Sequence, residues 1–295
     1  MENMTALVST FVRAYHYRNN TEWVFADEMA GTILSEEEYE SISHHMAEGI
    51  SYFAPDFKGS KDDALRFIVT QQLAPSVLLR TAFCEQAIGD AMKEGCRQII
   101  LFACGYETFS LRTRENTLHV FELDQPEMIK DKQKRISILE IQSRCQVEYI
   151  GCDLSLPLWK LELIKRGFDV KNKAFGSLLG ITYYLSKVAF RQLLKSLSSV
   201  MCEGSFICFD YPQVEDGLVS RRNRELAAAA GEAMKASYTY DDIKAMLLES
   251  GFIIDTHYNA DEATDLFFKD YNTKNVQNAM KAPKGVVYCL AVKTD

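Results

Sequence analysis

The chain has 295 residues, of which 47% are hydrophobic and 25% are charged, a composition typical of a globular protein. Its net charge of -8, without a long run of lysine or arginine, excludes the basic surface that a nucleic-acid backbone requires. No stretch reaches the roughly 18 apolar residues of a membrane helix, and the first residues show no signal-peptide pattern. We therefore expect a cytoplasmic protein with no nucleic-acid and no membrane partner.

The first 60 residues are expected to form short helices that carry many aromatic side chains. These aromatic residues are Phe11, Tyr15, Tyr17, Trp23, Phe25, Tyr52, Phe53 and Phe57. The segment could close over a site as a lid or simply cover a sheet, and both interpretations are open. As a lid, its rings would favour an apolar, ring-containing ligand.

From residue 62 onward, helical and strand patterns alternate along the chain. Short apolar runs predict strands at residues 97–103, 118–124, 146–153, 173–181, 204–212, 251–258 and 285–292. Longer periodic segments predict helices at residues 65–93, 125–142, 158–165, 186–200 and 240–250. This alternation predicts an α/β protein with a largely parallel sheet and helices on both faces.

One continuous domain is expected over residues 1–295, because no repeat or low-complexity tract interrupts the pattern. No clear helix is expected between the last two strands, so residues 259–284 would connect a hairpin-like edge of the sheet. The domain divides into an N-terminal helical cap, a core, a helical insertion and a C-terminal completion of the sheet, at residues 1–60, 61–212, 213–237 and 238–295. The insertion, like the cap, could close a site or only cover the sheet.

The turn after the first predicted strand reads Ala-Cys-Gly-Tyr-Glu-Thr, and Gly105 is its single glycine. Ligands of parallel sheets bind at such turns, and a dinucleotide needs the pattern G-x-G-x-x-G around its two phosphates. Here Tyr106, Glu107 and Thr108 add bulk and negative charge, which disfavours NAD and FAD. A ligand with a ribose but no phosphate suits the turn better, and S-adenosylmethionine, with its positive sulfonium, has that character.

Two acids lie at the end of the second predicted strand. Asp124 follows the turn by about 20 residues, where an acidic side chain can accept hydrogen bonds from both ribose hydroxyls. Followed by Pro126 and Glu127, it is equally typical of a helix N-cap, and one side chain could fill both roles. Glu122 is a second candidate for the cofactor site.

Asp153 and Arg80 are further candidates, each with a structural alternative. Asp153 ends the third predicted strand, where its carboxylate could accept from the adenine amino group or close an Asx-turn before Pro157. Arg80 lies late in the helix before the first strand. It could pair with the methionine carboxylate or extend to the surface.

Four stretches, taken in order and at their spacings, resemble one protein family. They are RAYHYRNNTEWVFADEMAGTIL with its Asp-x-x-Ala, LLRTAFCEQAI, ILFACGYETFSLR and VFELDQPEMIKDKQKRI. The chain resembles the leucine carboxyl methyltransferase-like S-adenosylmethionine-dependent methyltransferases, which include bacterial polyketide O-methyltransferases of the tetracenomycin type, over about residues 13–212. The resemblance implies the class I methyltransferase fold, a Rossmann-like three-layer sandwich with a mostly parallel seven-stranded sheet, an antiparallel edge strand and an N-terminal helical lid.

The resemblance also assigns roles to individual residues. It implies that Arg80 binds the methionine carboxylate, that Gly105 lets the backbone approach the cofactor closely, and that Asp124 binds the ribose. It further implies that Asp153 and Leu154 contact the adenine.

Two positions depart from the family pattern. Leu179 stands before Gly180 where the family has a glutamate, which removes an acidic group beside the amino or sulfonium region of the cofactor. Ala103 replaces the first glycine of the turn. These changes are compatible with weaker cofactor binding, an altered acceptor site or loss of catalysis.

Methyl transfer from a sulfonium is an in-line displacement, and a carboxylic acid acceptor, being ionised at neutral pH, needs no general base. A hydroxyl acceptor would gain from a base, for which Tyr183, Tyr184 and Tyr211 are weak candidates. We therefore expect an O-methyltransferase acting on a carboxylate or acidic hydroxyl of a small apolar or aromatic molecule. The alternatives are a catalytically silent protein that binds S-adenosylmethionine or S-adenosylhomocysteine, and a nucleotide-cofactor oxidoreductase.

The eight cysteines are scattered and show no Cys-x-x-Cys spacing. Most are expected to be small core residues in a reducing compartment. Histidines, cysteines and carboxylates do not cluster at ligand spacing, so no metal is expected.

Overall fold

The computed structural model describes residues 4–214 and 235–294. Its seven-stranded sheet has the order β3-β2-β1-β4-β5-β7-β6, in which β1 to β5 pair in parallel and β7 runs antiparallel to β5 and β6. The strands are β1 (Gln98–Phe102), β2 (His119–Asp124), β3 (Gln146–Gly151), β4 (Ala174–Ser177), β5 (Phe206–Pro212), β6 (Phe252–Tyr258) and β7 (Val286–Lys293). The predicted mostly parallel sheet with an antiparallel pair at one edge is confirmed.

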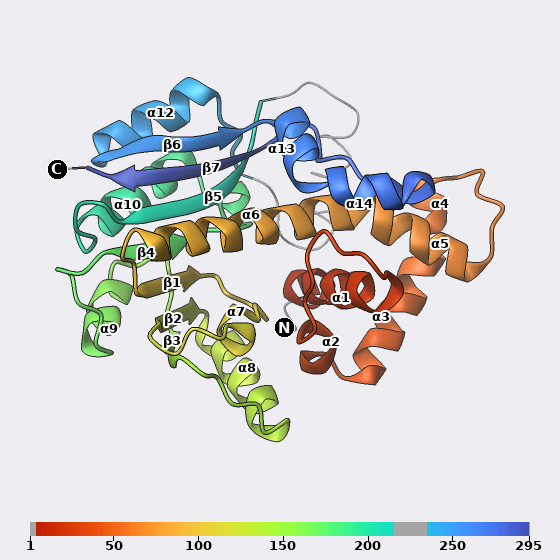
Figure 1. The fold of residues 1–295 in the computed structure, drawn as a ribbon, viewed down its shortest axis with the longest axis horizontal. Coiled ribbons are helices and arrows are strands. Elements are labelled where there is room, and N and C mark those ends of the chain that lie inside the picture. The colour runs from red at the N-terminus through yellow and green to blue at the C-terminus, as the bar shows by residue number, and fades with distance from the viewer. Residues whose placement is uncertain (1–3, 215–234, 295) are drawn as a thin grey trace.

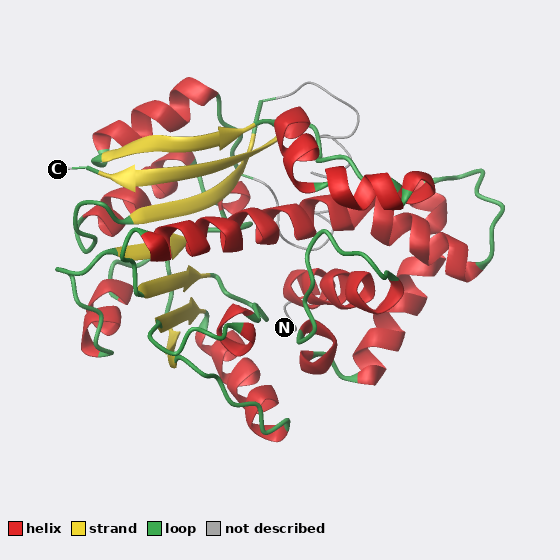
Figure 2. Cartoon of the chain, viewed as in Figure 1, coloured by secondary structure: helices red, strands yellow, loops and turns green. Residues whose placement is uncertain are grey.

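Helices cover both faces of this sheet (Figures 1 and 2). One face packs against α6 (Ala74–Lys93), α8 (Pro126–Ile138) and α13 (Ala260–Phe267), and the other against α9 (Trp159–Lys165), α10 (Lys187–Ser198) and α12 (Tyr240–Glu249). In β1, Ile99 and Leu101 belong to the first core, whereas Ile100 and Phe102 belong to the second. Successive side chains of a strand point to opposite faces, so one apolar run supplies both cores. The three-layer α/β prediction is confirmed.

The connection between β6 and β7 differs from the prediction, because it contains α13 and α14 (Lys269–Lys274). The side chain of Asn259 accepts hydrogen bonds from the backbone N–H groups of Asp261 and Glu262, at 2.9 and 3.0 Å. The Glu262 carboxylate in turn accepts from the backbone N–H of Asn259 at 2.9 Å. This reciprocal capping starts α13. The Asn-x-x-Glu pattern is typical of a helix start, and the prediction of a connection without a helix did not take it into account.

The predicted helix at residues 65–93 is a continuous helical segment with one widened turn. It consists of α5 (Lys61–Phe67), a π-helical turn at Ile68–Leu73 and α6. The backbone N–H of Ala74 bonds to the carbonyl of Val69, five residues earlier. Pro75 has no N–H to donate and its ring excludes an ordinary α-turn beneath it, which accounts for the wider turn at this point.

The N-terminal segment folds into α1 (Met4–Asn19), α2 (Ala30–Ile33), α3 (Glu36–Glu48) and α4 (Ile50–Phe53). Figure 1 shows these helices beyond the end of the sheet to which the arrows of β1 and β2 point. The expected N-terminal helices are therefore present and lie at the carboxyl ends of the strands. The insertion predicted at residues 213–237 falls mainly outside the described residues, and the division into four segments stays a prediction.

A buried ion-pair cluster, here called the Asp27 cluster, joins this N-terminal segment to the turn after β1. It consists of Arg13, Asp27, Glu85, Glu107 and Arg112. Arg13 Nη1 lies 3.0 Å from Asp27 Oδ2 and 3.1 Å from Glu107 Oε1. Arg112 Nε lies 3.2 Å from Asp27 Oδ1, and its guanidinium also pairs with Glu85. Asp27 is fully buried, so the cluster holds the loop before α2 directly against the turn.

A second set of polar contacts joins α3 to α8 and to the same turn. The Arg135 guanidinium donates to both carboxylate oxygens of Glu38, at 2.6 and 2.7 Å, and to Asp131 at 2.6 Å. It also lies 4.7 Å from the ring centroid of Tyr106, whose hydroxyl donates to Asp131 at 2.5 Å. The N-terminal helices are thus attached at two separate points.

We expect Asp27→Ala to lower the free energy of unfolding by about 3 to 5 kcal/mol, because buried Arg13 and Arg112 would lose a partner. Urea unfolding followed by circular dichroism measures this loss. Glu36→Ala is the matched control, since its ion pair with Arg18 is exposed and should contribute less than about 1 kcal/mol. Equal losses for the two variants would contradict a structural role for the cluster.

Ala103 adopts a strained backbone conformation immediately after β1. Its φ of +48° lies in the left-handed region, which costs a residue with a Cβ roughly 1 to 2 kcal/mol. We expect Ala103→Gly to raise the free energy of unfolding by about 0.5 to 1 kcal/mol, because the relieved strain exceeds the entropy gained by the unfolded chain. Ala245→Gly, at an exposed position of α12, should instead lower it by about the same amount. A lower urea midpoint for the Ala103 variant would show that the residue is unstrained.

Candidate functional site

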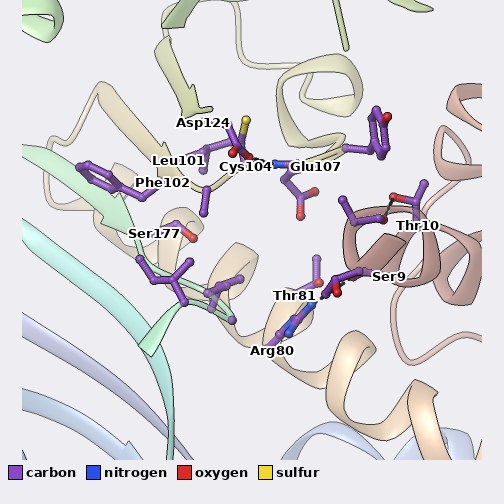
Figure 3. A pocket seen from close by; sticks show the side chains of 18 of the residues that line it. Ser9, Thr10, Arg80, Thr81, Leu101, Phe102, Cys104, Glu107, Asp124 and Ser177 are labelled. Carbon is purple, nitrogen blue, oxygen red and sulfur yellow. Dashed lines mark hydrogen bonds between the residues drawn. The ribbon is translucent and has the colours of Figure 1, made fainter. Parts of the chain in front are cut away.

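A cavity of about 550 Å³ lies at the carboxyl ends of β1, β2 and β4, where α1 and α6 meet the sheet (Figure 3). α1 contributes Thr5, Ala6, Ser9, Thr10 and Arg13 to its lining, and α6 contributes Arg80 and Thr81. The other lining residues are Leu101, Phe102, Ala103, Cys104, Gly105, Tyr106, Glu107, Asp124, Ser177, Leu179, Gly180, Ile181, Tyr184 and Lys235. Arg80, Gly105, Asp124 and Leu179, which the sequence singled out, therefore share one cavity.

Asp124 fixes the turn after β1 but does not cap the following helix, because the N-cap residue of α8 is Gln125 and no side chain caps it. Its Oδ2 accepts from the backbone N–H of Gly105 and its Oδ1 from that of Gln125, both at 2.7 Å. Burial raises the pKa of Asp124, although these two hydrogen bonds oppose the rise. Gly105 has a φ of +47°, and a Cβ there would lie 3.1 Å from the Cβ of Ala6. The turn therefore needs glycine both for its conformation and for the approach of α1.

Arg80 extends from α6 toward the loop after β4. Its Nη2 donates to Ser9 Oγ at 3.1 Å, and it forms no ion pair with any acid among the described residues. Gly180 has a φ of +70°, and a Cβ there would lie only 2.8 Å from Arg80 Nη1. The backbone N–H of Gly180 donates to buried Asp210 at 2.7 Å, so Asp210 holds this loop against the guanidinium.

Glu122 does not line the cavity. It is fully buried, pairs with the equally buried ammonium of Lys132 and accepts a hydrogen bond from Ser110 Oγ at 2.5 Å. These partners satisfy it within the protein, which leaves a role in cofactor binding without geometric support. Leu179, in contrast, does line the cavity, at the position where the family pattern has an acid.

Asp153 and Leu154 lie outside the cavity lining. The Asp153 carboxylate is exposed and accepts from the backbone N–H of Ser155 at 2.9 Å, as an Asx-turn does. The hydrogen bond to Ser155 also lowers the pKa of Asp153. Leu154 is half-buried against the second core. The contact of both residues with adenine stays a prediction.

The three tyrosine candidates are placed differently from one another. Tyr184 lines the cavity. Tyr183 is buried and donates its hydroxyl to Asp210 at 2.9 Å, and burial raises its pKa well above the ordinary value. Tyr211 is buried outside the cavity lining, with its hydroxyl 2.8 Å from His257 Nε2. Only Tyr184 of the three can therefore face a ligand in this cavity.

None of the five histidines is among the residues that line the cavity. His16 is buried in α1, where it accepts from the backbone N–H of Val24, and burial lowers its pKa to about 4. His119 begins β2, and thus lies at the opposite end of that strand from Asp124. The histidines therefore offer no base to a ligand in this cavity.

The N-terminal aromatic residues do not provide a binding surface in this cavity. None of the eight rings named in the sequence lines it, and Phe11 and Tyr15 are buried in the first core. Trp23 stacks on Tyr17 at the surface, with ring centroids 5.2 Å apart. These rings therefore give no support to an aromatic or apolar acceptor, and the class of the acceptor stays a prediction.

Sequence reasoning missed the polar residues that α1 contributes, chiefly Ser9, Thr10 and Arg13. Thr10 Oγ1 accepts from Arg13 Nη2 at 3.2 Å, and Arg13 Nη2 also donates to the carbonyl of Tyr106 at 2.9 Å. The available signal was an arginine and two hydroxyl side chains within the mostly apolar stretch at residues 6–15. No spacing in the sequence relates them to a turn about 90 residues later, so this contact follows only from the fold.

Further findings concern the cysteines, metal ligands and membrane helices. Cys104 lines the cavity, and burial raises the pKa of its thiol well above the ordinary value. Within residues 4–214 and 235–294, no group of three or more histidine, cysteine or acidic side chains could hold a metal ion. In the same ranges, no helix has the length and apolar character needed to span a bilayer.

The solved structures most relevant to the fold are only distantly similar in sequence. A DUF574 family protein from Streptomyces avermitilis superposes with a TM-score of 0.58 at 14% identity, covering 86% of this chain and 99% of that one. A protein from Thermobifida fusca, provisionally described as a methyltransferase, gives 0.52 at 13% identity, covering 98% and 94%. These likenesses support the class I methyltransferase fold.

Sequence comparisons give the family. The model described as leucine carboxyl methyltransferase matches residues 6–198. A relative from Bacillus subtilis (strain 168), with the provisional name S-adenosyl-L-methionine-dependent methyltransferase YktD, is 31% identical over 303 residues, which cover 99% of this chain and 98% of the relative. A similarly described relative from Mycobacteroides abscessus is 27% identical over 228 residues, covering 72% and 74%. The chain therefore belongs to the leucine carboxyl methyltransferase family, and it is an S-adenosylmethionine-dependent methyltransferase.

Proposed function

We propose that the cavity binds S-adenosylmethionine and that the protein transfers the methyl group to an oxygen of a small acidic molecule, either a carboxylate or an acidic hydroxyl. The observation that carries the choice of acceptor is the set of ionisable groups around the cavity. Of the lining residues Cys104, Tyr106 and Glu107, none is in a protonation state suited to removing a proton from a neutral hydroxyl near pH 7.

The charges and hydrogen-bonding groups of the lining suggest an orientation for the cofactor. Its methionine carboxylate would pair with Arg80, which has no acidic partner among the described residues. Its ribose would lie at Asp124, whose carboxylate the turn already holds in place. Gly105 and Gly180 bring backbone close to the space between these two groups. The resemblance assigns the same roles to Arg80, Gly105 and Asp124.

The acceptor is inferred from the candidates for a base. Although burial opposes ionisation, Arg13 and Arg112 lower the pKa of Glu107 to about 2, so this carboxylate cannot hold a proton removed at neutral pH. Burial raises the pKa of the Cys104 thiol and of the Tyr106 hydroxyl, which therefore stay protonated. An acceptor that is already ionised needs only alignment with the methyl group, which can supply about 7 to 11 kcal/mol of barrier reduction.

The family assignment affects the two alternative functions, an oxidoreductase and a silent binding protein, in different ways. A nucleotide-cofactor oxidoreductase has no support from the comparisons. A silent binding protein keeps some support, because Leu179 leaves the wall of the cavity without the family's acidic group. Membership of the tetracenomycin-type polyketide branch stays a prediction. Because of that prediction, the acceptors to be tested include polyketides with acidic hydroxyl groups.

We expect methyl transfer to a carboxylic acid with kcat/KM constant between about pH 6 and 8, because an acceptor with a pKa near 4 is fully ionised there. A panel of small carboxylic acids and phenols, assayed with radiolabelled S-adenosylmethionine, measures this. Methyl esters release methanol in alkali and ethers do not, which separates the two oxygen acceptors. Cofactor binding without transfer to any member of the panel would favour the silent protein, and transfer only to nitrogen would contradict the proposal.

We expect Arg80→Ala and Asp124→Ala each to weaken the binding of S-adenosylhomocysteine at least tenfold, or about 1.4 kcal/mol, by removing a charged partner of the cofactor. Isothermal titration calorimetry measures the change. Arg18→Ala is the control, since Arg18 pairs with Glu36 outside the cavity. Unchanged affinity in both variants would discredit the site. The variant Asp153→Ala tests the predicted adenine contact separately, and unchanged affinity in it would contradict that contact.

A further inference from the structure

We propose that Glu107 binds the α-ammonium group of S-adenosylmethionine, and so supplies the acidic group that position 179 lacks. This inference rests on the proposed placement of the cofactor in the cavity. In the family pattern, an acidic side chain in the loop after β4 lies beside this part of the cofactor. Here the turn after β1 would provide the acidic group instead.

Two carboxylates line the cavity among the described residues, Glu107 and Asp124. Asp124 has both oxygens engaged by backbone N–H groups and lies at the proposed ribose position. Glu107 Oε1 accepts from the backbone N–H of Thr108 at 2.7 Å and from Arg13 at 3.1 Å. Its Oε2 accepts no hydrogen bond from any described residue. One oxygen of Glu107 is therefore available to a ligand.

Glu107 and Arg80 lie on opposite sides of the cavity, with the Glu107 carboxylate extending into the space between them (Figure 3). The ammonium and carboxylate of an amino acid are bonded to the same carbon, so their partners must flank one small group. Arg80 offers the positive partner and Glu107 the negative one. Leu179 adds no charge to this part of the lining.

The charges around Glu107 leave it able to accept a cation. The Asp27 cluster contains two guanidinium groups, Arg13 and Arg112, and three carboxylates, Asp27, Glu85 and Glu107. With its three carboxylates ionised, the cluster has one negative charge in excess, and Glu107 is its acidic member on the cavity lining, beside Arg13. The low pKa of Glu107 means that this charge is present throughout the neutral range, since Arg13 and Arg112 outweigh the opposing effect of burial.

The test compares S-adenosylhomocysteine with its analogue in which hydrogen replaces the α-amino group, using isothermal titration calorimetry on the full chain. The unmodified protein should bind S-adenosylhomocysteine about tenfold more tightly, which is the effect of one charge-assisted hydrogen bond. Glu107→Gln should abolish this preference by weakening only the complete ligand. Equal affinity of the unmodified protein for both ligands would overturn the proposal without any variant.

Three further variants separate ligand binding from a structural role. Glu85→Gln removes a carboxylate of the same cluster that does not line the cavity, and it should keep the tenfold preference. Leu179→Glu, added to Glu107→Gln, should restore the preference by returning an acid to the family position. Glu107→Asp keeps the charge of the cluster but withdraws the carboxylate by one methylene, so it should lower the preference if Glu107→Gln does not fold.

The outcomes distinguish this inference from the proposed cofactor site. An equal loss of affinity for both ligands in Glu107→Gln would mean that Glu107 only shapes the turn, and would overturn the inference alone. An unchanged preference in that variant would do the same. If Arg80→Ala and Asp124→Ala leave the binding of both ligands unchanged, the cofactor site itself is wrong.

Discussion

The buried pairing of Asp27 with Arg13 and Arg112 is the interaction on which the cavity depends. It joins α1 and the loop before α2 to the turn after β1, elements that are far apart in the sequence. Without α1, the cavity at the carboxyl ends of the strands would lose the side that Ser9, Thr10 and Arg13 line. A buried ion pair that loses one partner leaves a charge without compensation. The cap and the turn therefore stabilise each other.

Much of the sheet could be predicted because apolar runs such as residues 98–102 are long enough to stand out and are separated by helical periods. The order of the strands in the sheet could not be predicted from the runs themselves, because tertiary contacts determine which strands pair. The prediction failed where a local signal competed with the pattern. Asn259 and Glu262 start a helix inside a polar connection, and Pro75 widens a turn inside a periodic segment.

The candidate site could be predicted where its residues follow strands directly, as Gly105 and Asp124 do, because parallel strands end at one edge of a sheet. Asp153 follows the same rule but turns toward its own loop, which strand position alone cannot reveal. Ser9 and Arg13 were missed because the tertiary fold, not sequence spacing, brings α1 to the cavity. The aromatic residues of the cap do not line the cavity, since aromatic rings are as useful for packing small helices as for binding ligands.

The π-helical turn at Ile68–Leu73 sets the direction in which Arg80 points. A turn of this kind holds one residue more than an α-turn, and each residue of an α-helix advances the side-chain direction by about 100°. The segments on either side are therefore out of phase by that angle, so α5 can pack on the N-terminal helices while α6 presents its arginine to the sheet edge. A helix without this extra residue could satisfy one of these two orientations but not both.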